Sequence, residues 1–203
     1  MHYLKILLIF SFFNLIAQSE NSLAEGPFSQ LIIRGATLIN GNGAPPIGPV
    51  DIVIENDKIT DIDVVGSPGV EIDESKRPKL NQGGKEINAL GMYILPGFID
   101  MHGHIGGEDQ GADWDYVFKL WLAHGITTIR EPSGRGVKYA VDLKKRSAKN
   151  EIVAPRIFAY TKFGQGSKKS ITSTNLAREW VRENAKNGAD GIKFFGAEPE
   201  IMK

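Results

Sequence analysis

Residues 93–104 read YILPGFIDMHGH, and this stretch decides the fold. The apolar run up to Ile99 is typical of a buried strand. Alternate residues of an extended segment point to the same side, so His102 and His104 present two imidazoles to one space. Imidazole nitrogens bind divalent cations such as zinc, and two rings at this spacing can hold one ion. Asp100 is placed to orient these ligands. The stretch therefore predicts a strand that ends in a pair of metal-binding histidines.

Downstream of this stretch, strand-like and helix-like segments alternate. The strand-like runs are residues 93–100, 126–129, 156–160 and 191–195, and apolar residues at helical spacing lie between them. Such alternation is typical of parallel βαβ units, in a doubly wound sheet or a (β/α)₈ barrel. No G-x-G-x-x-G follows the first strand, so the nucleotide-binding doubly wound fold has no support. A barrel would be present only up to its fourth strand, because the sequence stops at Lys203, shortly after that strand.

Upstream, residues 30–90 predict a small, strand-rich module. Residues 58–64 alternate apolar and polar side chains with period two, which is typical of a half-buried strand. Asn40-Gly41-Asn42-Gly43 is a dense turn signal between two apolar runs. Residues 67–84 are rich in charge, Pro and Gly and read as a loose loop. We expect a small β layer that needs a partner to bury its apolar face.

Residues 1–24 predict a secretory signal peptide. Lys5 supplies a positive charge, residues 6–17 are almost entirely apolar, and Ser22-Leu23-Ala24 provides a small-x-small cleavage site. The apolar run is shorter than the roughly 20 residues that a membrane-spanning helix needs. We therefore expect export to the periplasm or the medium, a mature chain beginning near Glu25 and no stable membrane span. An uncleaved N-terminal anchor is the alternative.

The composition of the chain excludes several classes of function. The 203 residues include 24 Lys and Arg against 24 Asp and Glu, and this balance argues against a nucleic-acid partner. The absence of Cys excludes disulfides, cysteine zinc sites and thiol nucleophiles. Besides the His102–His104 pair, the only histidines are His2 and His124. His124 lies at the end of a predicted helix, where the helix dipole favours it.

Residues 91–104 resemble the barrel strand 1 signature of the metal-dependent amidohydrolase superfamily, and in particular its imidazolonepropionase-like and dipeptidase-like members. Residues 125–130, GITTIR, are similar to its strand 2. The resemblance covers roughly residues 30–196. It implies an α/β fold in which part of a small N-terminal β-sandwich (25–90), after the predicted signal peptide (1–24), precedes the first half of a (β/α)₈ TIM barrel (91–203).

The resemblance also implies a set of site residues. The histidines matching His102 and His104 bind the more buried metal of the family. Lys193 stands where the strand 4 lysine is carboxylated by CO₂ and bridges two metals as a carbamate; an ammonium paired with a carboxylate across the barrel is the alternative. One or two divalent ions, with zinc expected, are the implied cofactors. Glu131 stands where the family often has Asp, and we assign it no role.

The implied reaction is hydrolysis of a C–N bond in a small-molecule amide or dipeptide, with metals that polarise the carbonyl and activate water. The family's strand 5 and 6 histidines and strand 8 aspartate have no counterpart after Lys193, so no catalytic set is complete and we expect an N-terminal fragment inactive alone. The alternatives are a shortened, non-enzymatic metal-binding paralogue, as a homo-oligomer that completes the barrel, and a different βα enzyme in which the metal is incidental.

Overall fold

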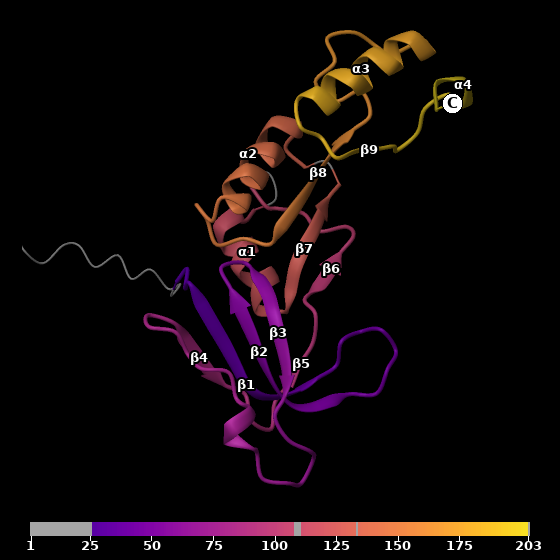
Figure 1. Cartoon of the computed structure of the whole chain (residues 1–203). Coiled ribbons are helices and arrows are strands. Elements are labelled where there is room, and N and C mark those ends of the chain that lie inside the picture. Colours follow the sequence, from indigo (N-terminus) through magenta and orange to yellow (C-terminus); the bar gives the residue numbers. More distant parts are fainter. Residues whose placement is uncertain (1–25, 108–110, 133, 203) are drawn as a thin grey trace, which may run out of the picture. The chain divides into compact units, whose positions relative to one another are not determined.

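The computed structural model of the chain describes residues 26–107, 111–132 and 134–202, so the predicted signal peptide lies outside the described residues. The chain divides between Ile94 and Leu95 into two compact units, each with its own sheet (Figure 1). Helices and strands together make an α/β protein, as the sequence predicts. Within the described ranges, no helix has the length and apolar character required to cross a bilayer.

The first unit is a five-stranded mixed sheet. Two antiparallel hairpins join its first three strands. Two short strands then pair with β1 in parallel, one after the other along its length. The order is β3-β2-β1-β4, and β5 also pairs with β1. The elements are β1 (Gln30–Leu38), β2 (Ile47–Glu55), β3 (Lys58–Val64), the short 3₁₀ helix η1 (Glu74–Lys76), β4 (Lys85–Asn88) and β5 (Tyr93–Ile94).

A bulge in β1 joins two apolar runs into one strand. The register of β1 against β2 shifts between Ile33 and Ala36, around Gly35. Gly35 has φ of +75°, a conformation that residues with a Cβ rarely adopt. Its N–H donates a 2.8 Å hydrogen bond to Asp51 Oδ1 instead of to the neighbouring strand. The bulge therefore directs a backbone donor at a buried carboxylate.

Asp51, in the middle of β2, is fully buried and is paired with two guanidinium groups. Arg77 donates from Nε to Oδ2 at 2.9 Å and from Nη2 to Oδ1 at 3.1 Å, and Arg34 Nη1 donates to Oδ2 at 3.1 Å. Burial, the largest single effect, raises the pKa of Asp51, but the bonds from Arg77, Gly35 and Arg34 together hold it below its usual value. Because Arg77 follows η1, this cluster fastens the segment between β3 and β4 to the sheet.

The second unit is a four-stranded parallel sheet, in the order β6-β7-β8-β9, with a helix after each strand. The strands follow one another in the sheet as they do in the sequence, which is what successive βαβ units produce. The elements are β6 (Phe98–Asp100), α1 (Trp114–Ala123), β7 (Ile126–Glu131), α2 (Val137–Ala148), β8 (Arg156–Lys162), α3 (Thr174–Lys186), β9 (Gly191–Lys193) and α4 (Pro199–Met202).

Helices α1 and α2 cover one face of this sheet (Figure 1). Ile157 and Ala159 of β8 are buried in the cluster that includes Phe118 of α1 and Leu143 of α2. Phe158, which lies between them and points the other way, is 43 % exposed. The sheet of the second unit is therefore packed on one face and carries exposed apolar side chains on the other.

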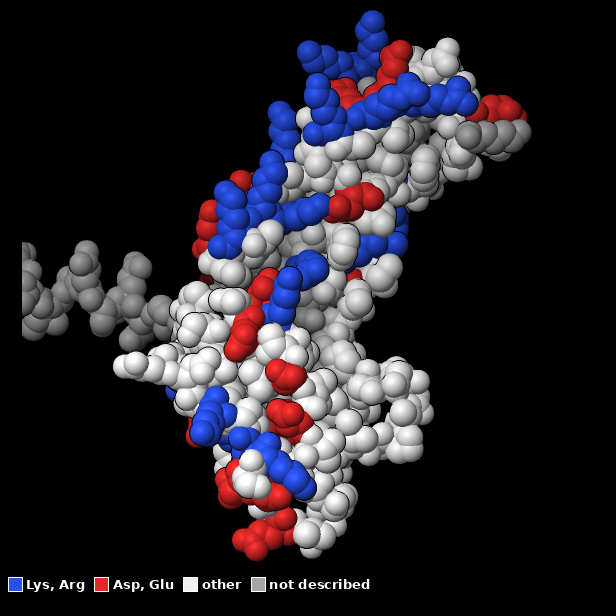
Figure 2. Space-filling model, in the orientation of Figure 1, with Lys and Arg blue, Asp and Glu red and all other residues white. Residues whose placement is uncertain are grey.

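An ion pair places the start of β9. Both carboxylate oxygens of Asp190 lie 2.6 Å from Lys144 Nζ on α2, and Oδ2 also accepts a hydrogen bond from the backbone N–H of Ala159 on β8. Asp190 directly precedes Gly191, so these contacts fix the position at which β9 joins β8. On the face drawn in Figure 2, Lys and Arg side chains are interspersed with Asp and Glu side chains.

Candidate metal centre

Polar side chains gather at the C-terminal ends of the strands of the second unit. His102 and His104 follow β6, Glu131 ends β7, Lys162 ends β8 and Lys193 ends β9. The strands are parallel, so these ends lie along one edge of the sheet. In open α/β sheets and in barrels alike, this is the edge where ligand and active sites form.

The structure brings His102 and His104 together. Their ring centroids are 5.4 Å apart and the ring planes are inclined by 71°. Two imidazoles bound to one tetrahedral zinc at about 2.0–2.1 Å would have centroids about 5 Å apart. The pair therefore fits a divalent ion in residue type and in separation. Among the residues that the structure describes, no group of three or more His, Cys, Asp or Glu side chains is placed to hold a metal.

Backbone contacts hold the His102–His104 segment in place. Asp100 Oδ1 accepts a 2.7 Å hydrogen bond from the N–H of His102, so Asp100 acts on the backbone and not on an imidazole. Trp121 of α1 donates from Nε1 to the carbonyl of His104 at 3.2 Å. A Cβ at Gly103 would lie 3.1 Å from Ile129 Cγ2, so glycine allows the segment to lie close against β7.

Glu131 is the site residue that the sequence reasoning missed. It is 0 % exposed, and its Oε2 accepts a 2.8 Å hydrogen bond from the N–H of Ile105. Its Oε1 accepts a 2.5 Å bond from the N–H of Gly134 and lies 3.4 Å from Nδ1 of His104. A carboxylate at the last position of a buried strand, where an apolar residue would continue the pattern of Ile129, is the signal that could have identified it.

Lys193 lies at the same edge of the sheet, at the end of β9. It is partly buried, and its Nζ lies 5.2 Å from the ring centroid of Phe195. Lys162, its register partner on β8, places its own Nζ 5.1 Å from the same ring. Lys193 and the His102–His104 pair therefore follow the two outer strands of this sheet, β9 and β6, at the same edge, and the role of Lys193 as a ligand stays a prediction.

His124 takes no part in this site. It caps the C-terminal end of α1, and its Nδ1 lies 2.8 Å from the carbonyl oxygen of Leu120. This position agrees with the helix-terminal role predicted from the sequence. His124 is thus a natural control for experiments on the other two histidines.

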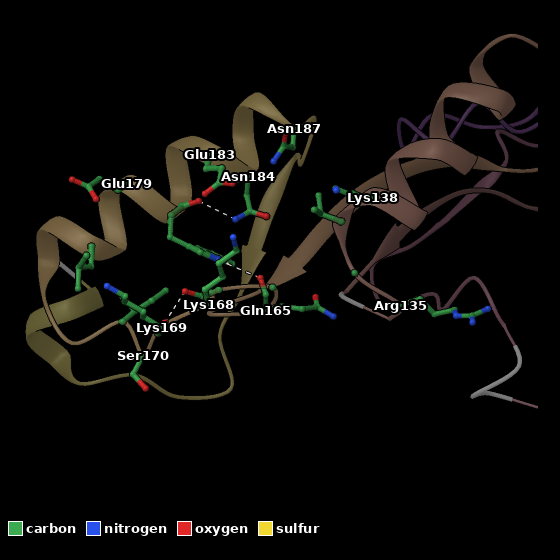
Figure 3. A pocket seen from close by; sticks show the side chains of 17 residues that line it. Arg135, Lys138, Gln165, Lys168, Lys169, Ser170, Glu179, Glu183, Asn184 and Asn187 are labelled. Carbon is green, nitrogen blue, oxygen red and sulfur yellow. Dashed lines mark hydrogen bonds between the residues drawn. The ribbon is translucent and has the colours of Figure 1, made fainter.

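A cavity of about 790 Å³ lies elsewhere in the second unit (Figure 3). It is bounded by the start of α2, the segment after β8 and the helix α3. Trp180 Nε1 donates to the carbonyl of Gln165 across its wall, and the buried Asn184 donates to the carbonyl of Trp180. None of His102, His104 and Lys193 lines it, so the cavity is separate from the candidate metal centre.

Comparison with known proteins gives relatives in sequence and in structure. No family model matches the chain. It is 40 % identical over 111 residues to a 5-methylthioadenosine/S-adenosylhomocysteine deaminase from Caldicellulosiruptor saccharolyticus, over 54 % of this chain and 24 % of the deaminase. It is 32 % identical over 108 residues to an adenine deaminase from Halalkalibacterium halodurans, over 45 % of this chain and 18 % of that enzyme. The chain thus spans less than a quarter of the length of these relatives.

Solved structures show the same fold. A Xaa-Pro dipeptidase with methionine bound in its active site superposes with a TM-score of 0.61 and 22 % identity, over 82 % of this chain and 47 % of the dipeptidase. The deaminases supply the sequence relationship and the dipeptidase supplies the fold, and both agree with the resemblance carried by residues 91–104. In sequence and in fold, the chain is therefore similar to members of the metal-dependent amidohydrolase superfamily.

Proposed function

We propose that this chain carries the first metal-binding segment of a hydrolase that cleaves C–N bonds in small molecules. The observation that carries the proposal is the His102–His104 pair, held at a separation that suits one ion, at the C-terminal edge of a parallel sheet. The relatives support the reaction class, because a deaminase and a dipeptidase both replace a C–N bond with a C–O bond. Small amides and dipeptides are the substrates that we propose.

We also propose that the second unit is the first half of a (β/α)₈ barrel and that the first unit is part of a β-sandwich. Four parallel strands in sequence order, with helices on one face, are what half of such a barrel contains. Phe98 and Phe158 are 60 % and 43 % exposed, and closure of a barrel would bury side chains of this kind. The chain also covers 47 % of the dipeptidase structure.

In this proposal each residue has a distinct task. His102 and His104 hold a divalent ion through ring nitrogens, and zinc suits these ligands. Bound zinc would supply Lewis acidity toward the substrate oxygen and toward water. Asp100 fixes the backbone that carries both rings. The Lys193 amine adds to CO₂ to form a carbamate and releases a proton to solvent. The Lys162 ammonium lies over the same Phe195 ring, so its neighbour is then the anionic carbamate and not the Lys193 ammonium.

Zinc binding tests the metal centre directly. Wild type, His102→Asn, His104→Asn and the control His124→Asn are titrated with Zn²⁺ by calorimetry, and bound metal is measured after dialysis. We expect wild type and His124→Asn to bind zinc equally, and each of the other variants to lose at least a large part of the affinity. Equal binding by all four proteins would refute the assignment of the two histidines.

The reading frame beyond the codon for Lys203 tests the enzymatic part. We expect it to continue and to supply two more histidines and an aspartate at the ends of strand-like runs. The longer product should then release amine or ammonia from dipeptides, N-acyl amino acids or aminopurines, while the 203-residue chain should not. A stop codon at that point would replace the hydrolase with the alternative, a metal-binding paralogue without catalysis.

Two finer parts of the proposal have their own tests. A carbamate on Lys193 would give a ¹³C NMR signal from protein equilibrated with ¹³C-bicarbonate, and the signal should be absent in Lys193→Arg. We further propose that the chain is exported. N-terminal sequencing of protein recovered outside the cytoplasm should then begin near Glu25, whereas an intact Met1 would contradict cleavage.

A further inference from the structure

We propose that Glu131 is the positioning residue of the metal centre: it fixes the His104 imidazole with its proton on Nδ1, and so leaves the Nε2 lone pair free for the ion. This inference rests on the proposed metal-binding function. It assigns a task to a buried carboxylate that neither the sequence pattern nor the proposed ligand set explains.

The first step is the rigidity of the carboxylate itself. Glu131 is the last residue of β7 and is 0 % exposed. Its two oxygens accept hydrogen bonds from two different segments, from Ile105 N–H after β6 and from Gly134 N–H after β7. Hydrogen bonds from N–H groups to a carboxylate are short and strong, so the orientation of the group is fixed before any ligand arrives.

The second step is what the fixed carboxylate faces. Oε1 lies 3.4 Å from Nδ1 of His104, whose side chain is 46 % exposed. At this distance the nearest ring nitrogen is drawn to an anion, which favours the proton on Nδ1. An imidazole held in that tautomer leaves the Nε2 lone pair free for a cation, which is the usual arrangement of a ligating histidine with a carboxylate behind it.

The third step is that Glu131 also holds the backbone next to His104. Ile105 directly follows His104, and its N–H is one of the two donors to Glu131. The side chain and the backbone of the ligand are therefore set by one carboxylate, while Trp121 fixes the carbonyl of His104 from the other side. Removal of the charge at Glu131 would loosen the ring and the backbone together.

The side-chain length at this position is part of the argument. Glu131 reaches Ile105 N, Gly134 N and His104 Nδ1 at once. An aspartate would draw the carboxylate back by one carbon–carbon bond, about 1.5 Å, so it could not keep all three contacts without movement of β7. Glu131→Asp should therefore behave as a partial loss, between wild type and Glu131→Gln.

The test begins with the metal-free, full-length wild-type chain. Long-range ¹H–¹⁵N correlation spectra at a pH where His104 is neutral identify which ring nitrogen carries the proton, and exposed His102 serves as the reference in the same spectrum. We expect the Nδ1–H form for His104. The Nε2–H form would overturn the proposal without any variant, and without reference to whether zinc binds.

Variants then separate positioning from simple structural support. Glu131→Gln should weaken the Nδ1–H preference of His104 and raise the zinc dissociation constant about 10- to 100-fold, whereas exposed Glu179→Gln, the matched control on α3, should change neither. A folded Glu131→Gln with unchanged tautomer and unchanged zinc affinity would overturn the proposal. If that variant does not fold, Glu131→Asp and the wild-type tautomer decide. Failure of wild type to bind zinc would instead refute the proposed function.

Discussion

Replacement of Asp51 by Asn should destabilise the first unit severely. The side chain is fully buried and accepts hydrogen bonds from Gly35 N, from Arg34 and twice from Arg77. The asparagine amide is neutral and cannot accept all of these bonds. Two guanidinium groups that are only 16 % and 18 % exposed then lose their buried counter-charge and keep only the more exposed Glu86 and Glu74. Removal of one partner from a buried ion pair costs about 3–5 kcal/mol, a large part of the roughly 5–15 kcal/mol that stabilises a domain.

Urea unfolding measures this cost. All three tryptophans, Trp114, Trp121 and Trp180, lie in the second unit, so their fluorescence follows that unit while far-ultraviolet circular dichroism follows both. The first unit unfolds in the part of the dichroism change that no change in tryptophan fluorescence accompanies. In Asp51→Asn, the midpoint of this transition should fall to a much lower urea concentration. Asp61→Asn, an exposed change on β3, should stay within about 0.5 kcal/mol of wild type. A loss below about 1 kcal/mol in Asp51→Asn would refute the reasoning.

Three further outcomes follow from single contacts. The pKa of Asp51 is depressed in the folded chain, so the stabilisation that its charge gives should be complete above the unfolded pKa of about 3.9. This stabilisation should be lost as the pH falls through the lower folded pKa. Acid titration followed by circular dichroism measures the loss, and Asp51→Asn should not show it. Ser173→Ala removes the oxygen that caps Leu176 N–H and should cost α3 about 1 kcal/mol in urea unfolding. Gly188→Ala forces a Cβ onto a residue with φ of +99°, 3.0 Å from Val141, and should lower the melting temperature, whereas unchanged melting would contradict the strain.

Most elements of the second unit could be predicted because their signals are local. The single buried strand expected over residues 93–100 is wrong, because Tyr93–Ile94 pairs with β1 in the first sheet and only Phe98–Asp100 belongs to the second. Apolar spacing marks α1 and α2, Ser173 begins α3, and Gly125 and Gly188 follow helix ends with positive φ. Each signal acts within one or two turns of chain, so neighbouring residues are enough to read it. The alternation of strand and helix then favours a parallel sheet, which the structure contains.

The sequence could not reveal contacts between residues far apart in the chain. Arg77 lies in a segment that reads as a loose loop, yet it is paired with Asp51, which stands 26 residues earlier. Glu131 bonds Ile105 across the same number of residues, and nothing in the local pattern of β7 indicates its partner. Lys193 was assigned by resemblance, and the structure adds that Lys162 stands beside it over Phe195. Pairings of this kind depend on strand order and register, which a local pattern does not specify.

The two fully buried carboxylates differ in how their charge is compensated, and this difference bears on function. Asp51 faces two guanidinium groups, so its charge is neutralised within the first unit and its task is stability. Glu131 accepts hydrogen bonds from two backbone N–H groups and lies next to the half-exposed His104. A buried carboxylate needs such donors, and here they hold it beside a proposed metal ligand. Its task in our proposal is therefore to position that ligand, and zinc titration of Glu131→Gln measures how much it contributes to metal binding.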